Sequence, residues 1–287
     1  MCKQLNLFFP EWQGGPYRQV YDGAKQLVET LEKRLLFQKI FVDLNEKLVT
    51  ENNIIGYKTI LSQQMEAIET INKYQPDSIF TVGGNCSVGI APIDYLNRRF
   101  SGDLAVVWLD AHGDINTPES SLSKYFTGMP IRHLLGEGDA EIGCLLSSTL
   151  KPEQIILAGT RSLDAAESEY IQKAGIKIIP PETLDSSPET IAHYISSKGF
   201  KYVYVHIDTD VLSETAFHFS AWPSKTGISL ETLISILEGI NRKLRVVGAS
   251  LVEFFPCDEL GMGQLQLILN KLVFNKHSLV DTQGCIR

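Results

Sequence analysis

Two apolar runs of the chain end in acidic residues at alternate positions, and this pattern restricts the possible folds most. The run Leu104–Leu109 is followed by Asp110, His112 and Asp114. The run Tyr202–Ile207 is followed by Asp208 and Asp210. Alternate residues of an extended chain point to one side, so each segment presents a row of oxygen and nitrogen donors. Carboxylates that converge at strand ends repel one another unless divalent cations lie among them. The pattern therefore predicts a two-metal centre.

Short β-branched or aromatic runs alternate with amphipathic segments along nearly the whole chain. We expect strands at Leu5–Phe9, Ile40–Leu44, Ser78–Val82, Leu104–Leu109, Gln154–Ala158, Ile176–Ile179, Tyr202–Ile207 and Val246–Val252. The apolar period predicts helices at about 18–33, 56–74, 87–99, 126–136, 164–174, 187–198, 229–241 and 259–274. The strands are apolar throughout, which is typical of a parallel sheet covered on both faces.

The length and the absence of a linker or repeat favour one large α/β domain over residues 1–287. Segments 111–125 and 211–226 show no period, and each follows an aspartate-bearing strand end. Loops at the carboxyl ends of parallel strands build the site in such folds, so we expect these two segments to set substrate specificity.

Charge and composition exclude several kinds of partner. A net charge of −8 argues against nucleic acid or an anionic membrane surface. No segment has the roughly 20 apolar residues of a membrane span, and the apolar run near the start is too short for a signal peptide. The five cysteines are odd in number and lack paired spacing, which favours a reducing, cytoplasmic setting.

A third block precedes the two aspartate blocks. The strand 78–82 leads into Gly83-Gly84-Asn85-Cys86-Ser87, where glycine permits close backbone approach. Gly-Gly-Asn-x-Ser, Asp-Ala-His-x-Asp and x-Asp-x-Asp, each ending a strand, resemble the signature blocks of the ureohydrolase (arginase/agmatinase) family in order and separation. The resemblance covers essentially the whole chain. It implies a three-layer αβα sandwich around a mainly parallel eight-stranded sheet, with two divalent metal ions, usually Mn²⁺.

The resemblance also implies a ligand set. Asp110, Asp114 and Asp208 would be shared or bridging carboxylates, His112 would bind one metal, and Asp210 would complete a site. Oxygen-rich donors with one imidazole suit a hard or borderline ion such as Mn²⁺. Any one of these side chains alone is more often a turn cap or a surface group, but capping explains five of them at alternate positions poorly.

Cys86 stands where the family normally places a histidine ligand. A thiolate there adds negative charge and favours Fe²⁺, Co²⁺ or Zn²⁺ over Mn²⁺ at that position. The alternative is a neutral thiol beside a weakened or empty site. Cysteine at this position is associated with family members that hydrolyse hydroxyarginine. His206 shares a strand face with Asp208 and could approach the gap, but a supporting hydrogen bond to a ligating carboxylate is the favoured role.

Thr127 is a second departure, because arginases carry a histidine there that is thought to relay protons or assist the departing amine. Threonine cannot do this at neutral pH, so we expect it to play only a supporting role. General acid–base help is worth about 10²–10⁴-fold, so ordinary arginine hydrolysis should suffer. A substrate with a less basic nitrogen leaving group would suffer less.

Other positions match the family's residues for holding an α-amino acid. Asn116 and Ser123 align with groups that hydrogen-bond the α-carboxylate. Asp164 aligns with the group that meets the α-ammonium, with Glu167 close by, and Glu253 aligns with the glutamate that anchors the guanidinium. The alternative for the loop residues is an ordinary turn or helix cap. Together they favour an amino-acid substrate over a decarboxylated amine.

These observations predict hydrolysis of arginine or Nω-hydroxyarginine to urea or hydroxyurea and an ornithine-like amine. Hydroxide formed between two metal ions would attack the amidine carbon, with Glu253 positioning the guanidino group and Asp114 holding the transferred proton. The resemblance implies a homo-oligomer, a trimer or hexamer. One alternative is a degenerate arginase-fold protein with a binding or assembly role. A metallophosphatase is a weaker alternative, because the two site loops offer only Lys124 and Lys225 for phosphate.

Overall fold

The computed structural model describes residues 3–272, and eight strands in this range form one parallel sheet. In sheet order they are β2 (Gln38–Lys39), β1 (Gln4–Phe9), β5 (Ser78–Gly83), β10 (Arg245–Val252), β9 (Tyr202–Asp208), β6 (Leu104–Leu109), β7 (Ile155–Ala158) and β8 (Lys177–Ile179). A separate antiparallel hairpin consists of β3 (Thr50–Glu51) and β4 (Ile54–Ile55). The strands with the aspartate blocks, β6 and β9, are neighbours near the middle of the sheet.

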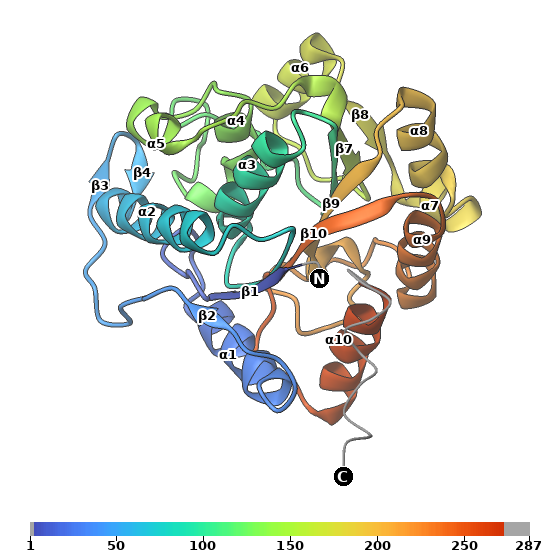
Figure 1. Ribbon diagram of the computed structural model, residues 1–287, viewed down its shortest axis with the longest axis horizontal. Helices are drawn as coiled ribbons and strands as arrows, with labels where there is room; N and C mark the ends of the chain where they lie inside the picture. Colours follow the sequence, from blue (N-terminus) through green and yellow to red (C-terminus); the bar gives the residue numbers. More distant parts are fainter. Residues whose placement is uncertain (1–2, 273–287) are drawn as a thin grey trace.

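Helices cover both faces of the sheet (Figure 1). On one face lie α1 (Gln19–Leu31), α7 (Pro181–Ser186), α8 (Thr190–Lys198), α9 (Leu230–Lys243) and α10 (Glu259–Lys271). On the other lie α2 (Tyr57–Tyr74), α3 (Ile90–Arg99), α4 (Pro130–Leu134), α5 (Ala140–Leu145) and α6 (Ala165–Ala174). This arrangement confirms the expected three-layer αβα sandwich. Within the described range, none of the helices has the length and apolar character needed to cross a membrane.

The central strands are apolar on both sides because each side packs against a different helix layer. In β9, Val203, Val205 and Ile207 join the core beneath α8 and α9. Tyr204, between them, joins the core on the opposite face. Alternate residues of a strand point to opposite faces, so both faces of a covered parallel sheet require apolar side chains. Polar side chains, His206 and Asp208, occur only near the carboxyl end of β9.

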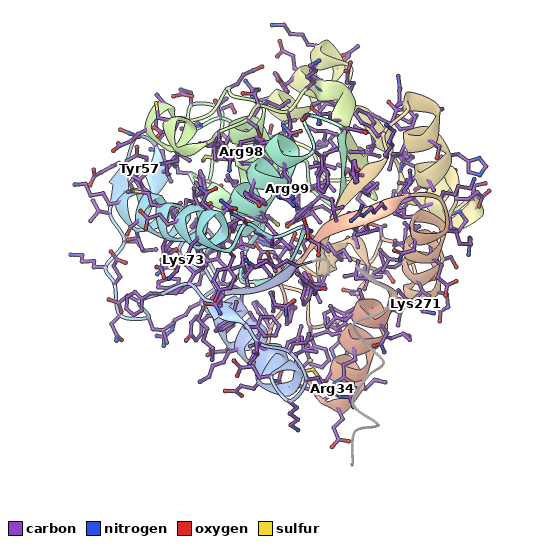
Figure 2. The ribbon with its side chains drawn as sticks, viewed as in Figure 1. Arg34, Tyr57, Lys73, Arg98, Arg99 and Lys271 are labelled. Carbon is purple, nitrogen blue, oxygen red and sulfur yellow. The ribbon has the colours of Figure 1, made fainter. Side chains whose placement is uncertain are left out.

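A tyrosine ties α2 to the short helix α5, which the apolar period does not predict. Tyr57 lies at the start of α2 (Figure 2). Its hydroxyl oxygen lies 2.9 Å from Asp139 Oδ1 and 2.8 Å from Glu141 Oε2, so its one proton can be donated to either carboxylate. Asp139 also caps α5 by accepting from the backbone N–H of Ile142. The helix therefore depends on tertiary hydrogen bonds and a cap rather than on its own short sequence.

Two expected elements differ from the structure. The strand expected at Ile40–Leu44 is wrong, because β2 covers only Gln38–Lys39 and the chain then turns, with Asp43 Oδ1 accepting from the N–H of Asn45. Edge strands are often this short, and an aspartate that bonds its own backbone favours a turn. The helix expected at 126–136 is divided into a 3-10 helix, Phe126–Gly128, and α4, because Pro130 cannot continue a preceding helix.

Candidate metal centre

The ends of β6 and β9 carry three of the predicted ligands. Asp110 follows β6 directly, Asp208 is the last residue of β9, and Asp210 lies in the 3-10 helix Thr209–Val211. The two strands run parallel as neighbours, so their carboxyl ends meet. All three carboxylates are at most 2% exposed. The alternating pattern therefore brings these acids together at one buried edge, as the sequence predicts.

His112 lies beside two of these acids. Its Nδ1 is 2.9 Å from Asp210 Oδ2 and 3.4 Å from Asp110 Oδ1. Backbone amides orient the carboxylates: the N–H of His112 donates to Asp110 Oδ1, and the N–H of Ala111 donates to Asp210 Oδ1. The N–H of Asp210 donates to Asp208 Oδ1. Asp110, His112 and Asp210 thus offer ligand atoms within 4.8 Å of one another.

Cys86 belongs to the same cluster. It begins the 3-10 helix Cys86–Gly89, directly beyond the end of β5. Its Sγ lies 3.2 Å from Asp208 Oδ2 and 3.7 Å from Asp110 Oδ2. With Asp208 and Glu253 it forms a second group whose ligand atoms lie within 4.8 Å of one another. The residue at the family's histidine position is therefore in contact with two predicted carboxylate ligands.

Asp114 is held beside Asp110 by an indole. Trp108 Nε1 donates to Asp110 Oδ2 at 3.2 Å and to Asp114 Oδ2 at 3.3 Å. The backbone of Asp114 has φ +50°, in the left-handed region that residues other than glycine seldom adopt. Such conformations collect at functional sites, where the surrounding structure enforces them. The position of Asp114 is consistent with its predicted role.

The electrostatics of the cluster favour bound cations. Burial raises the pKa of five acidic groups of the cluster, and adjacent carboxylates raise it further: Cys86, Asp114, Asp208, Asp210 and Glu253, the last to about 8. Burial also opposes charge on Asp110, but the hydrogen bonds and charge of His112 outweigh it and lower the pKa of this carboxyl. Burial opposes charge on His112, but hydrogen bonds to Asp110 and Asp210 outweigh it and raise the pKa of this imidazole to about 12. Two dications would balance this buried acidity, and the oxygen, imidazole and thiol donors fit hard or borderline divalent ions.

Thr127 links the thiol position to the predicted guanidinium anchor. Its Oγ1 donates to Glu253 Oε1 at 2.7 Å and accepts from the backbone N–H of Cys86 at 3.2 Å. Glu253 directly follows β10, is 3% exposed and has φ +59°. The hydroxyl at position 127 thus orients the Glu253 carboxylate, a contact that the sequence pattern does not reveal.

His206 is buried behind the cluster. Its Nδ1 lies 2.7 Å from Ser250 Oγ, and its ring stacks on Trp108 with 3.6 Å between centroids. The expected hydrogen bond to a ligating carboxylate is not found: within residues 3–272, Nε2 has no hydrogen-bond partner. Burial lowers the pKa of His206 to about 3, against the pull of Asp110.

The residues predicted to hold an α-amino acid are partly used by the fold. Asp164 caps α6: its carboxylate accepts from the N–H of Glu167, and the Glu167 carboxylate accepts from the N–H of Asp164. Asn116 Nδ2 donates to Asp164 Oδ2 at 2.8 Å, so these two residues do lie together. Ser123 is exposed, and its Oγ accepts from the N–H of Tyr125 at 3.3 Å. Substrate contact by this set stays a prediction.

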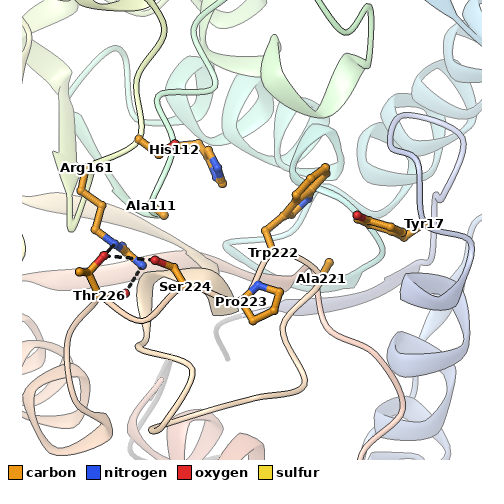
Figure 3. Close-up of a pocket in the computed structure, with 10 residues that line it drawn as sticks. Tyr17, Ala111, His112, Arg161, Ala221, Trp222, Pro223, Ser224 and Thr226 are labelled. Carbon is orange, nitrogen blue, oxygen red and sulfur yellow. Dashed lines mark hydrogen bonds between the residues drawn. The ribbon is translucent and has the colours of Figure 1, made fainter.

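A pocket of about 420 Å³ opens next to His112 (Figure 3). Its aromatic wall consists of Trp222 and Tyr17, whose ring centroids are 4.9 Å apart, and Trp222 is 6.3 Å from the His112 ring. On the opposite side, Arg161 donates to the carbonyl oxygens of Asp210 and Thr226. The pocket has the size of a small-molecule site. Both unpatterned segments, 111–125 and 211–226, contribute to its lining.

Glu11 is a buried acid that the sequence patterns do not identify. It is 0% exposed, and its Oε1 accepts from Ser87 Oγ at 2.6 Å and from Asn85 Nδ2 at 3.2 Å. A Cβ at Gly84 would lie 1.9 Å from the Glu11 carbonyl oxygen, which explains the glycine. Glu11 therefore supports the turn that presents Cys86. Burial raises the pKa of Glu11 to about 7.

We expect Glu11→Gln to weaken the dependence of stability on pH. The pKa of Glu11 is raised from 4.5 in the unfolded chain to about 7 in the folded protein. The protonated carboxyl therefore contributes its full stability below about pH 4.5, and this contribution is lost as the pH rises through about 7. At about 1.4 kcal/mol per pKa unit, the loss is on the order of 3 kcal/mol. Urea unfolding of metal-free protein at about pH 5 and about pH 8 measures it. The exposed Glu169→Gln is the control. An equal effect of Glu11→Gln at both pH values would contradict the prediction.

Comparison with known protein families places most of the chain in one family. The model of the Arginase family matches residues 20–274. An arginase of Staphylococcus aureus (strain MRSA252) is 29% identical over 226 residues, which are 75% of this chain and 73% of that protein. The N(omega)-hydroxy-L-arginine amidinohydrolase of Streptomyces lavendulae is 29% identical over 238 residues, 81% of each chain. The ends of β5, β6, β9 and β10, which carry the acidic cluster, lie within the matched region.

Solved structures share the fold at lower sequence identity. An arginase of Entamoeba histolytica, solved with L-ornithine, superposes with a TM-score of 0.85 at 22% identity, over 94% of this chain and 98% of its own. An arginase of Bacillus subtilis gives a TM-score of 0.79 at 23% identity, over 96% and 99% of the two chains. The fold of this chain is therefore shared with these structures over nearly the full length of both chains.

Proposed function

The chain belongs to the arginase family, and from this premise we propose that it is a binuclear-metal amidinohydrolase of an arginine-like amino acid. The observation that carries the proposal is the cluster at the ends of β5, β6, β9 and β10. Three overlapping groups of donor atoms, each within 4.8 Å, lie there beside a pocket of about 420 Å³. Such a concentration of acids next to a small-molecule pocket is typical of a metal-dependent active site.

The proposed ligands are Cys86, Asp110, His112, Asp114, Asp208 and Asp210. Two divalent ions, for which Mn²⁺ is the first candidate, supply an activated water at neutral pH when bound. Glu253 holds the guanidino group through paired N–H···O hydrogen bonds while water adds to the amidine carbon. Asp114 holds the proton from water and passes it to the departing nitrogen. The C–N bond then breaks, giving urea or hydroxyurea and an ornithine-like amine.

We infer that the preferred substrate carries an N-hydroxyguanidino group. Thr127 hydrogen-bonds Glu253 and Cys86, but its hydroxyl is too weak an acid and base to transfer a proton near neutral pH, so the leaving nitrogen receives no help from this position. In both substrates the departing nitrogen is that of the ornithine-like amine, but an N-hydroxy group withdraws electrons from the guanidino carbon and so favours addition of water to it. The similarity to the Streptomyces lavendulae hydroxyarginine amidinohydrolase supports the same substrate class. Asn116, Ser123, Asp164 and Glu167 are the proposed contacts to its amino-acid end.

The proposal includes a reducing, cytoplasmic setting. Cys86, Cys144 and Cys257 are free thiols in the structure, and Cys86 can serve as a ligand only while it is reduced. A homo-oligomer, trimer or hexamer, is proposed from family resemblance alone.

A substrate panel on purified protein tests the proposal. We expect Mn²⁺-loaded protein to release ornithine faster from Nω-hydroxyarginine than from arginine. Cys86→His replaces a thiolate by an imidazole, which suits Mn²⁺ better, and should raise Mn²⁺ affinity by about 10–100-fold and speed arginine hydrolysis. Cys144→Ser, at an exposed position, is the control. No turnover of any guanidino or formimino compound with two bound metal equivalents would refute the enzymatic proposal.

The competing function is a degenerate member of the family with a binding or assembly role. The observation behind it is the joint replacement of two histidines of the family pattern, at Cys86 and Thr127. Metal content separates the two proposals. Two equivalents per chain favour catalysis, whereas zero or one equivalent favours the degenerate protein.

A further inference from the structure

His206 is a buried imidazole that lies directly behind the acidic cluster. It lies on β9, two residues before Asp208, and is 0% exposed. Its ring is nearly parallel to that of Trp108, at an interplanar angle of 8°. Trp108 in turn donates its indole N–H to Asp110 and Asp114. The imidazole thus belongs to the layer of side chains directly behind the acidic cluster.

One nitrogen of this imidazole is engaged and the other is not. Ser250 pairs with His206 in register on the neighbouring strand β10, and its Oγ lies 2.7 Å from Nδ1. Nε2 has no hydrogen-bond partner among the residues that the structure describes. A polar atom buried without a partner is costly, and such atoms are rare in folded proteins. The unpaired nitrogen therefore indicates a group that is missing from the protein alone.

Two further side chains with possible ligand atoms lie close to the His206 imidazole. Cys86, Asp110 and His206 each offer one ligand atom, and these atoms lie within 4.8 Å of one another. All three side chains are buried, and Cys86 Sγ is 3.7 Å from Asp110 Oδ2. When Nδ1 carries the proton and donates it to Ser250 Oγ, the lone pair of Nε2 is the one left to bind a metal ion. A hydrogen bond at the other ring nitrogen is what orients most metal-binding histidines.

We propose that His206 Nε2 is a direct metal ligand and supplies the imidazole that Cys86 replaces in the first sequence block. This inference rests on the proposed two-metal function and deepens it. One cation is bound by sulfur, nitrogen and oxygen donors from Cys86, His206 and Asp110. The other is bound near His112 by nitrogen and oxygen donors. A thiolate and an imidazole favour Co²⁺ or Zn²⁺ over Mn²⁺ at the first position.

The number of metal-bound histidines tests the proposal on the intact protein. In Co²⁺-loaded protein with ¹⁵N-labelled histidine, NMR should show two histidines with paramagnetically shifted nitrogens, His112 and His206. His206→Phe keeps a ring against Trp108 but removes the donor, so the count should fall to one. The affinity for one Co²⁺ should also fall by at least about 10–100-fold, the loss typical of removing even a supporting partner. His193→Gln, on the exposed face of α8, should leave the count at two.

A second variant identifies the histidine if His206→Phe does not fold. Ser250→Ala removes the partner of Nδ1, so it should move one shifted resonance and leave the other in place. A count of one in wild-type protein with two bound Co²⁺ would overturn the role of His206 while leaving the two-metal function intact. Failure to bind Co²⁺ at all would instead overturn the proposed function itself.

Discussion

Asp208→Asn is expected to remove at least one metal ion and to lower turnover by at least about 10³-fold. Asp208 Oδ2 faces Cys86 Sγ, while Oδ1 accepts from the N–H of Asp210. An amide keeps the shape but loses the charge that a shared ligand must supply. Metal ions contribute several kcal/mol to transition-state stabilisation, and each 1.4 kcal/mol corresponds to about a factor of ten. Elemental analysis and ornithine release measure the two effects.

The same substitution should stabilise the metal-free protein against thermal unfolding. Burial and neighbouring carboxylates raise the pKa of Asp208 well above its usual range, so neutralising it relieves repulsion and should raise the thermal midpoint without metal. Asp94→Asn is the matched control, because Asp94 is also buried but accepts hydrogen bonds from Ser147 and Ser148. It should lower stability and leave the metal content at two. Retention of both metals by Asp208→Asn would contradict the shared-ligand assignment.

The sequence predicts the parts of the site that depend on local periodicity. Asp110, Asp208 and Asp210 follow apolar strands at two-residue spacing, and neighbouring parallel strands end at the same edge. The rule therefore places them together without knowledge of the helices. It also places His206 on the face of Asp208. It cannot say which ring nitrogen is engaged, because this depends on Ser250, 44 residues away.

Other parts of the site depend on contacts between distant segments. The Glu11 carboxyl accepts hydrogen bonds from Asn85 and Ser87, about 75 residues away in the sequence. Tyr17 and Trp222 meet in one wall of the pocket although about 200 residues separate them in the sequence. Neither contact leaves a local pattern. Sequence periodicity therefore locates the proposed metal ligands but not the residues that form the pocket wall.

At Glu253, a strained backbone and hydrogen bonds together fix the orientation of the side chain. Its backbone has φ +59°, and its N–H donates to the carbonyl oxygen of Gly84 while its own carbonyl accepts from Ala221 N–H and Thr209 Oγ1. These bonds enforce a conformation that costs on the order of 1–3 kcal/mol. The side chain is fixed in turn by Thr127. The fold therefore maintains one orientation of a buried carboxylate, as the anchoring of a planar guanidinium requires.

Glu253→Gln is expected to lower kcat/KM for the guanidino substrate by about 10²–10³-fold while the metal content stays at two. Removing one partner of a buried, hydrogen-bonded charge pair costs about 2–5 kcal/mol, and the substrate cation would be left without its counter-charge. Because Glu253 also lies within ligand distance of Cys86 and Asp208, metal content must be measured on the same sample. A lost metal would make Glu253 a ligand rather than an anchor. Thr127→Val is the companion variant: it removes only the orienting hydroxyl, so its effect should be smaller and confined to the substrate step.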